Sequence, residues 1–208
     1  MKRMKTNRTW AATVSTFAIA ISIAGSVVAL PANECPGYPA SVASSSFDPA
    51  IEYPDTARKL AKKWARVFQI PSSWLVSQSY AESLNHPTAT NKSGATGLLQ
   101  IKLTRARDLV KWIEMSRWKA SALVQNTLKR YWHGLRHNLL DPDLNVMLAA
   151  FDLHHLRQRF GSDHRLVAAA YNQGEGRISR CLAAGHSLPP RALEYVARVE
   201  RAKRMGYV

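Results

Sequence analysis

The chain has 208 residues, and its 29 Lys and Arg against 14 Asp and Glu give a formal net charge of +15 at pH 7. Such an excess favours an anionic partner, for example a cell wall or a membrane surface. Nucleic acid is another polyanion that binds basic proteins, but we do not expect it, because the basic residues are scattered and the N-terminus indicates export.

The first element that we expect is an export segment. Four basic residues and no acid lie within the first eight positions, and the run from Trp10 to Leu30 carries no charge. A basic start followed by an apolar run is typical of a signal peptide, although about twenty-one apolar residues also suffice to span a bilayer. Residues 1–29 are therefore expected to be a signal peptide cleaved after about Ala29, or a retained membrane anchor. Both place the rest of the chain in the periplasm or cell envelope.

Residues 30–54 are expected to form a linker, because they are rich in proline and contain three consecutive serines. The linker holds Cys35, and the second of the two cysteines is Cys181. An oxidising compartment and an even cysteine count allow these two to form a disulfide. The alternative is two unpaired thiols, and neither cysteine has a neighbouring His that would suggest catalysis.

Residues 55–208 have the length of one domain with its own core. Apolar residues recur every three or four positions from Asp55 to Phe68, which predicts an amphipathic helix. A second helix is expected to start at Pro71, with Ser72 and Ser73 as caps, and to be ended by Pro87. Glu82 would then share its core-facing side with apolar residues.

Helical patterns continue to the end of the chain. We expect a long stretch over residues 104–131, broken near Arg117, a helix capped by Asp141, a short helix over residues 163–171, and a last helix introduced by Pro189 and Pro190. No alternating run is long enough to predict a sheet. The sequence therefore predicts a mostly α domain.

Glu82 is the first candidate for chemistry. A carboxyl group on the core-facing side of a helix loses hydration, which raises its pKa and suits it to donate a proton. No Lys or Arg lies within four residues of Glu82 to form an ion pair. The alternative is an ordinary surface glutamate.

Two further motifs lie downstream. In Gly94-Ala95-Thr96-Gly97-Leu98-Leu99-Gln100-Ile101 the two glycines allow a sharp turn, and Gln100 is the polar residue left to face a cleft. In Ala170-Tyr171-Asn172-Gln173-Gly174 a helix terminus presents Tyr171 and Asn172. A tight turn entering a core segment, and a buried Tyr followed by a capping Asn, are the structural alternatives.

These motifs, in the order Glu82-Ser83, Gly94–Ile101 and Ala170–Gly174, resemble those of the lytic transglycosylases, relatives of goose-type lysozyme that cleave bacterial peptidoglycan. The resemblance covers roughly residues 70–199 and implies a lysozyme-like helical domain with a cleft. It also implies that Glu82 is the catalytic residue. By the same resemblance the residues that orient the sugar are Ser83, Gln100, Tyr171, Asn172 and Tyr195.

The resemblance implies a reaction without a cofactor or metal. One carboxyl group protonates the bond between N-acetylmuramic acid and N-acetylglucosamine and then deprotonates the muramic acid 6-hydroxyl, which gives a 1,6-anhydro end. His154, His155 and His164 lack the spacing of a zinc motif. The expected partners are peptidoglycan strands, and small members of the family often serve secretion, conjugation or phage machines.

The chain departs from the family pattern at two places. Where the family usually has Phe-Asn-Pro after Glu-Ser, this chain reads Asn85-His86-Pro87, and where the family usually has Met-Pro after Gln-Ile, it reads Lys102-Leu103. Substrate affinity is therefore expected to differ. A hydrolytic lysozyme and a non-catalytic protein of peptidoglycan binding or assembly remain the alternatives, and exo versus endo cleavage is open.

Overall fold

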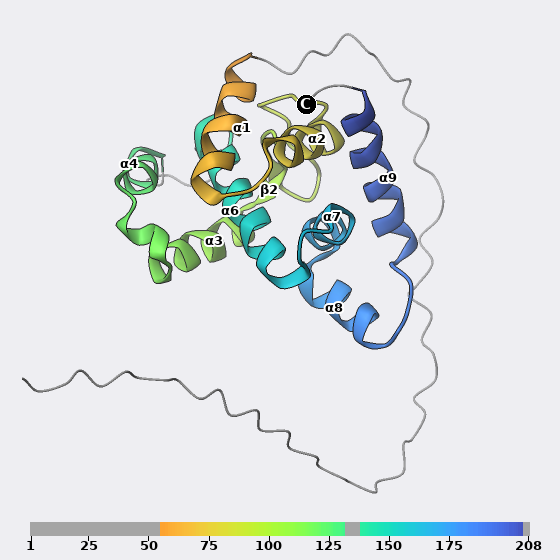
Figure 1. Cartoon of the computed structure of the whole chain (residues 1–208). Helices are drawn as coiled ribbons and strands as arrows, with labels where there is room; N and C mark the ends of the chain where they lie inside the picture. Colours follow the sequence, from red (N-terminus) through yellow and green to blue (C-terminus); the bar gives the residue numbers. More distant parts are fainter. Residues whose placement is uncertain (1–54, 132–137, 206–208) are drawn as a thin grey trace, which may run out of the picture. The chain divides into compact units, whose positions relative to one another are not determined.

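Eight α-helices and one short 3-10 helix make up most of the described residues, 55–131 and 138–205, in the computed structural model (Figure 1). The helices are α1 (Asp55–Phe68), α2 (Ser72–Ser83), α3 (Leu103–Met115), η1 (Arg117–Ala120), α4 (Ala122–Tyr131), α6 (Pro142–Phe160), α7 (His164–Gln173), α8 (Glu175–Ala183) and α9 (Pro190–Arg204). Two strands of two residues, β1 (Ala95–Thr96) and β2 (Ile101–Lys102), complete the fold. The prediction of a mostly α domain is confirmed.

Helices α2 and α6 form the centre of the core. Every residue from Trp74 to Tyr80 in α2 and from Leu144 to Leu153 in α6 is buried. Helix α1 packs against both, α9 packs against α2 and α7, and α7 also packs against α6. Helix α2 is therefore covered by α1 and α9 as well as by α6.

The helix boundaries follow local hydrogen bonds. Asp141 caps α6 by accepting bonds from the backbone N–H of Asp143 and Leu144, and Asp163 caps α7 in the same way, which confirms both expected starts. Pro71 is the N-cap of α2, so Ser72 and Ser73 lie inside the helix and are not its caps.

The other end of α2 also differs from the expectation. It ends at Ser83 rather than at Pro87, because Leu84 adopts a left-handed φ of 52°. The expected break near Arg117 is present: Ser116 leaves the helical conformation and its side chain accepts a bond from the backbone of Trp118.

The two strands form an antiparallel hairpin that the sequence did not predict. Ala95 pairs with Lys102 and Thr96 with Ile101. Between them Gly97 has a φ of 82°, and a Cβ atom at this position would lie 2.3 Å from Asn145 Nδ2. Such close contact and a positive φ both require glycine. The hairpin is thereby seated directly on α6.

Asn145 holds the hairpin through three hydrogen bonds. It is fully buried, its Nδ2 donates to the carbonyl oxygens of Thr96 and Leu139, both at 2.9 Å, and its Oδ1 accepts from the backbone N–H of Leu99 at 2.9 Å. All polar atoms of this buried amide side chain are therefore used by the backbone around it.

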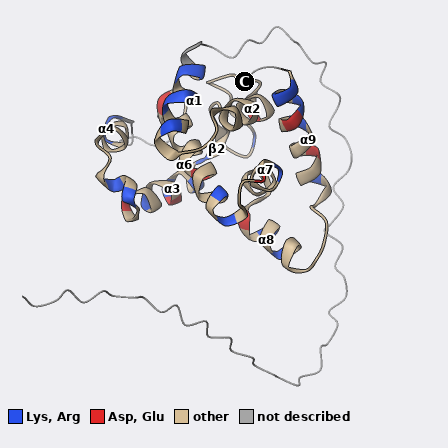
Figure 2. Ribbon diagram, in the orientation of Figure 1, with Lys and Arg blue, Asp and Glu red and all other residues tan. Residues whose placement is uncertain are grey.

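The expected signal peptide or anchor, the linker and Cys35 lie outside the described residues. Cys181 lies on α8 and is partly exposed, so its pairing stays a prediction. Among the helices that the structure describes, none is long and apolar enough to cross a membrane. Figure 2 shows Lys and Arg on α1, α3, α6 and α9 rather than on one helix.

Candidate active site

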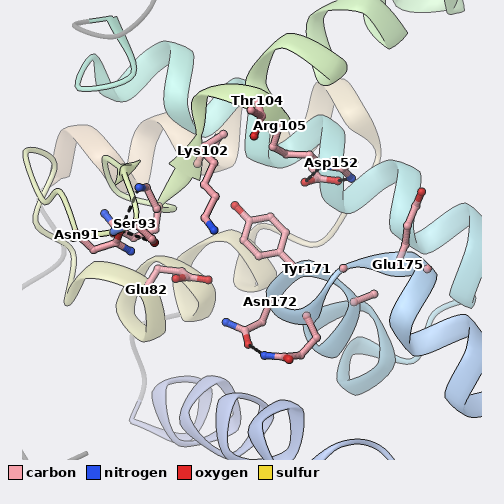
Figure 3. A pocket seen from close by; sticks show the side chains of 17 residues that line it. Glu82, Asn91, Ser93, Lys102, Thr104, Arg105, Asp152, Tyr171, Asn172 and Glu175 are labelled. Carbon is pink, nitrogen blue, oxygen red and sulfur yellow. Dashed lines mark hydrogen bonds and ion pairs between the residues drawn. The ribbon is translucent and has the colours of Figure 1, made fainter. Parts of the chain in front are cut away.

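A pocket of about 590 Å³ opens where α2, the hairpin, α3, α6, α7 and α8 meet. Figure 3 shows Glu82 facing the segment that carries Lys102, Thr104 and Arg105 across this pocket. Its lining residues are Glu82, Asn91, Ser93, Ala95, Gln100, Ile101, Lys102, Thr104, Arg105, Asp152, Ala170, Tyr171, Asn172, Gln173, Gly174, Glu175 and Gly176. Segments almost a hundred residues apart in the chain thus form one site.

Glu82 lies in the last turn of α2 with its carboxyl group toward the pocket. Burial raises the pKa of Glu82 from 4.5 to about 7, against smaller opposing effects of the Tyr195 hydroxyl and the charge of Arg198. The buried Tyr195 hydroxyl has no other hydrogen-bond partner among the described residues. A carboxyl group with a pKa near 7 can both donate and accept a proton at neutral pH.

Tyr171 projects from α7 beside Glu82 (Figure 3). Its hydroxyl donates to the backbone carbonyl of Leu99 at 2.8 Å. Burial, followed by the charge of Glu82, raises the pKa of Tyr171 well above its ordinary value. The hydroxyl therefore stays protonated, with its proton directed at the hairpin and its oxygen free to accept a bond from a ligand.

Side chains from α2 and from the hairpin itself fix the same turn. The Ser83 hydroxyl, which is buried, donates to the backbone carbonyl of Leu98 at 2.8 Å. Gln100 Nε2 donates to the carbonyl oxygens of Ala89 and Gly97. The side-chain oxygen of Gln100, Oε1, has no hydrogen-bond partner among the described residues and is available to a ligand in the pocket.

Asn172 lies near the end of α7 and is exposed. Its Oδ1 accepts a hydrogen bond of 2.6 Å from Gln173 Nε2, and Gly174, with a φ of 86°, ends the helix. The Asn172 amide nitrogen is left as a donor at the mouth of the pocket.

The end of the pocket away from Glu82 carries more charge. Arg105 donates through Nε and Nη2 to both carboxylate oxygens of Asp152, with an Nε–Oδ2 distance of 3.0 Å, and its guanidinium lies over the ring of Trp112. His155 Nε2 lies 3.0 Å from a carboxylate oxygen of Glu175. Neither pair was expected from the sequence, although an Asp within the apolar run of α6 is a signal for a buried ion pair.

Of the residues expected to act on the substrate, four line the pocket: Glu82, Gln100, Tyr171 and Asn172. Ser83 and Tyr195 are buried behind the lining. The three histidines noted in the sequence have separate surroundings, because His164 stacks on Trp74, His155 contacts Glu175 and His154 meets the edge of Trp118. Within residues 55–131 and 138–205 no group of three or more His, Cys, Asp or Glu is placed to hold a metal ion.

Comparison with known proteins gives one family. The model of the transglycosylase SLT domain matches residues 59–193. The soluble lytic murein transglycosylase of Escherichia coli (strain K12) is 27% identical over 171 residues, which are 81% of this chain and 24% of the relative. The protein of the same name from Salmonella typhimurium is 26% identical over the same shares. The chain thus spans about a quarter of the length of the curated relatives that it matches.

Solved structures agree with this comparison. The 70 kDa soluble lytic transglycosylase of Escherichia coli is 26% identical with a TM-score of 0.60, over 74% of this chain and 24% of that one. A complex of the 70 kDa enzyme with bulgecin A is 25% identical with a TM-score of 0.58, over the same shares. An inactive mutant of the lytic transglycosylase Slt from Pseudomonas aeruginosa, 23% identical with a TM-score of 0.51 over 74% of this chain and 22% of that one, shares the fold.

Proposed function

Because the chain belongs to the transglycosylase SLT domain family, we propose that it cleaves peptidoglycan between N-acetylmuramic acid and N-acetylglucosamine, with Glu82 as its catalytic acid and base. The observation that carries this proposal is a half-buried carboxyl group facing a pocket, with a pKa of about 7. An ordinary glutamate would be almost fully ionised at neutral pH and could not donate a proton.

In the first step Glu82 donates its proton to the oxygen of the glycosidic bond. The bond between C1 of muramic acid and this oxygen breaks, and N-acetylglucosamine leaves with the proton. The 2-acetamido group of muramic acid stabilises the positive charge that develops at C1. General acid catalysis of this kind contributes about 10²- to 10⁴-fold to a rate.

In the second step the ionised Glu82 removes the proton of the muramic acid 6-hydroxyl, and this oxygen bonds to C1. The product is a 1,6-anhydro sugar, Glu82 regains its proton, and no water is consumed. Gln100, Tyr171 and Asn172 would orient the sugar through the lone pairs and the amide donor that they leave free in the pocket.

The state of Asp152, a second carboxyl group of the pocket, supports this one-acid mechanism. Glycoside hydrolases usually place two carboxyl groups on either side of the bond. Asp152 lines the same pocket, but its two oxygens accept bonds from Arg105. Asp152 is thus occupied in a structural pair, whereas Glu82 is in no ion pair with a described residue.

The substrate locates the activity in the cell envelope, where the expected export segment at residues 1–29 would deliver the protein. Basic residues lie on several helices (Figure 2), which suits a protein that contacts an anionic cell wall. Opening the wall locally for a secretion, conjugation or phage machine is one process that such an enzyme would serve.

Peptidoglycan incubated with wild type, Glu82→Gln and Glu194→Gln tests the proposal, since Glu194 is an exposed carboxylate on α9 that lies outside the pocket. Mass spectrometry of the soluble muropeptides should detect anhydromuramic ends from wild type and Glu194→Gln, and at least about 10²-fold less from Glu82→Gln. Products heavier by one water would identify a hydrolase. Retained binding to the wall without any product would identify a non-catalytic binding protein.

A further inference from the structure

Lys102 is an exposed residue that also lines the pocket. It is the last residue of β2 and is one of the pocket-lining residues. Figure 3 shows its side chain extending from the hairpin toward the part of the pocket that Glu82 and Tyr171 line. Lys102 is exposed, and its side chain extends along the pocket rather than away from it.

The other charged groups of the pocket do not neutralise Lys102. Asp152 is paired with Arg105, and Glu175 contacts His155 at 3.0 Å. Burial has the largest effect on the pKa of Glu82, and the cation whose charge lowers this pKa is Arg198. Among the described residues Lys102 has no ion pair or side-chain hydrogen bond, so its positive charge remains available to whatever enters the pocket.

We propose that Lys102 is a substrate-binding residue whose ammonium group binds a carboxylate carried by the muramic acid residue bound beside Glu82. The inference rests on the proposed function and names the group that this chain recognises in its substrate. N-acetylglucosamine is neutral, whereas muramic acid bears a lactyl group that ends in a carboxylate or continues into a stem peptide with carboxylates of its own. A cation at this place therefore distinguishes the two sugars.

The same contact fixes the direction of the strand. Only one of the two sugars that flank the bond supplies an anion, so Lys102 favours the register in which C1 of muramic acid faces Glu82. It also favours a peptidoglycan strand over a neutral polymer of N-acetylglucosamine. The family motif usually has Met at this position, so Lys102→Met removes the charge and retains a side chain that relatives accommodate there.

Binding is measured in the Glu82→Gln background, in which strands are not consumed. The added substitutions are Lys102→Met, Lys102→Arg and, as a control, Lys111→Met, since Lys111 is exposed on α3 and does not line the pocket. The ligands are peptide-bearing strands, strands stripped of peptide to free the lactyl carboxylates, and stripped strands with these carboxylates converted to methylamides.

Lys102→Met should weaken binding of a carboxylate-bearing strand about fivefold, the size of one partly exposed charge-assisted contact. Arg at the same position should restore it, and the methylamide strands should bind all variants equally. Weakening with the stripped strands identifies the lactyl carboxylate as the ligand group. Weakening with the peptide-bearing strands alone identifies the stem peptide.

Equal weakening for the methylamide strands, no weakening for either charged strand, or no binding to any strand overturns the proposal. Cleavage of the peptide-bearing strands by the protein with Glu82 intact is measured in parallel. Absence of cleavage together with a charge-dependent loss of binding refutes the enzymatic function and leaves the role of Lys102 in place. With cleavage present, Lys102→Met should raise KM and leave kcat unchanged.

Discussion

Glu82 and Asp152 are carboxyl groups on the two central helices, both line the same pocket, and their surroundings differ. Burial raises the pKa of each, and for Asp152 the hydrogen bonds and charge of Arg105 oppose that rise directly. Glu82 has only the Tyr195 hydroxyl and the charge of Arg198 to oppose it. One carboxyl group is thus held in a structural pair, and the other is left to exchange a proton.

The difference shows that burial alone does not define a catalytic acid. Burying an unpaired carboxylate costs free energy. A protein avoids this cost either by pairing the carboxylate with a cation or by keeping the carboxyl group protonated. Asp152 takes the first solution and stabilises the junction of α3 and α6. Glu82 takes the second, which makes it reactive and lowers the stability of the fold at higher pH.

The largest effect is expected from breaking the Asp152 pair. Arg105→Met leaves Asp152 buried without its partner and should lower the free energy of unfolding by about 3–5 kcal/mol. Urea unfolding measures this, with Arg107→Met, an exposed neighbour on α3, as the control. The double variant Arg105→Met/Asp152→Leu should recover most of the loss. A single variant as stable as wild type would mean that the pair does not stabilise the fold.

Glu82→Gln should have the opposite effect. The unfolded chain ionises Glu82 at its ordinary pKa of 4.5, whereas the folded protein keeps the proton to about pH 7. The folded state therefore binds more protons in this interval, and its stability falls as the pH rises through it. Removing the ionisable group should stabilise the protein by on the order of 3 kcal/mol above pH 7 and change little below pH 4.5.

The measurement is the difference between Glu82→Gln and wild type in urea unfolding at several pH values, with Glu194→Gln as the control. Differences are needed because burial lowers the pKa of His164 to about 4, and its contribution to stability rises with pH between about 4 and 6.5. A difference that does not change with pH would contradict the elevated pKa of Glu82.

A smaller effect concerns the pH dependence of the reaction. Since Glu82 must be protonated to act as an acid, cleavage should fall roughly tenfold per pH unit above about pH 7. The charge of Arg198 lowers the pKa of Glu82, so Arg198→Met should move this decline to higher pH. Initial rates of muropeptide release between about pH 5 and 9 measure both. A decline that begins near the ordinary pKa of a glutamate would contradict the assignment.

Local signals were sufficient for much of the fold. Asp141 and Asp163 identify helix starts because a capping carboxylate acts within three residues of its own position. The hairpin was missed because its strands have two residues each, too few to alternate. Helix α8 was missed because Gly174 and Gly176 lie at its start, where they suggest a loop.

The candidate site was predictable where a motif carries it and not where it depends on packing. Glu82, Gln100, Tyr171 and Asn172 were identified through a resemblance, and their roles stay proposals. The pair of Arg105 and Asp152 joins residues 47 positions apart, so no local pattern connects them. The position of Lys102 was noted in the sequence only as a departure from the family motif.

Asn145 and Gly97 have a consequence for how the site meets its ligand. A rigid, fully buried amide bonds three backbone groups around a glycine that has no room for a side chain. The conformational entropy of the hairpin is therefore lost when the protein folds and not when a peptidoglycan strand binds. Tyr171 and Ser83 add to this from two other helices. The side of the pocket that carries Gln100 and Lys102 is thus rigid before the ligand binds, and binding free energy remains available for distorting the sugar.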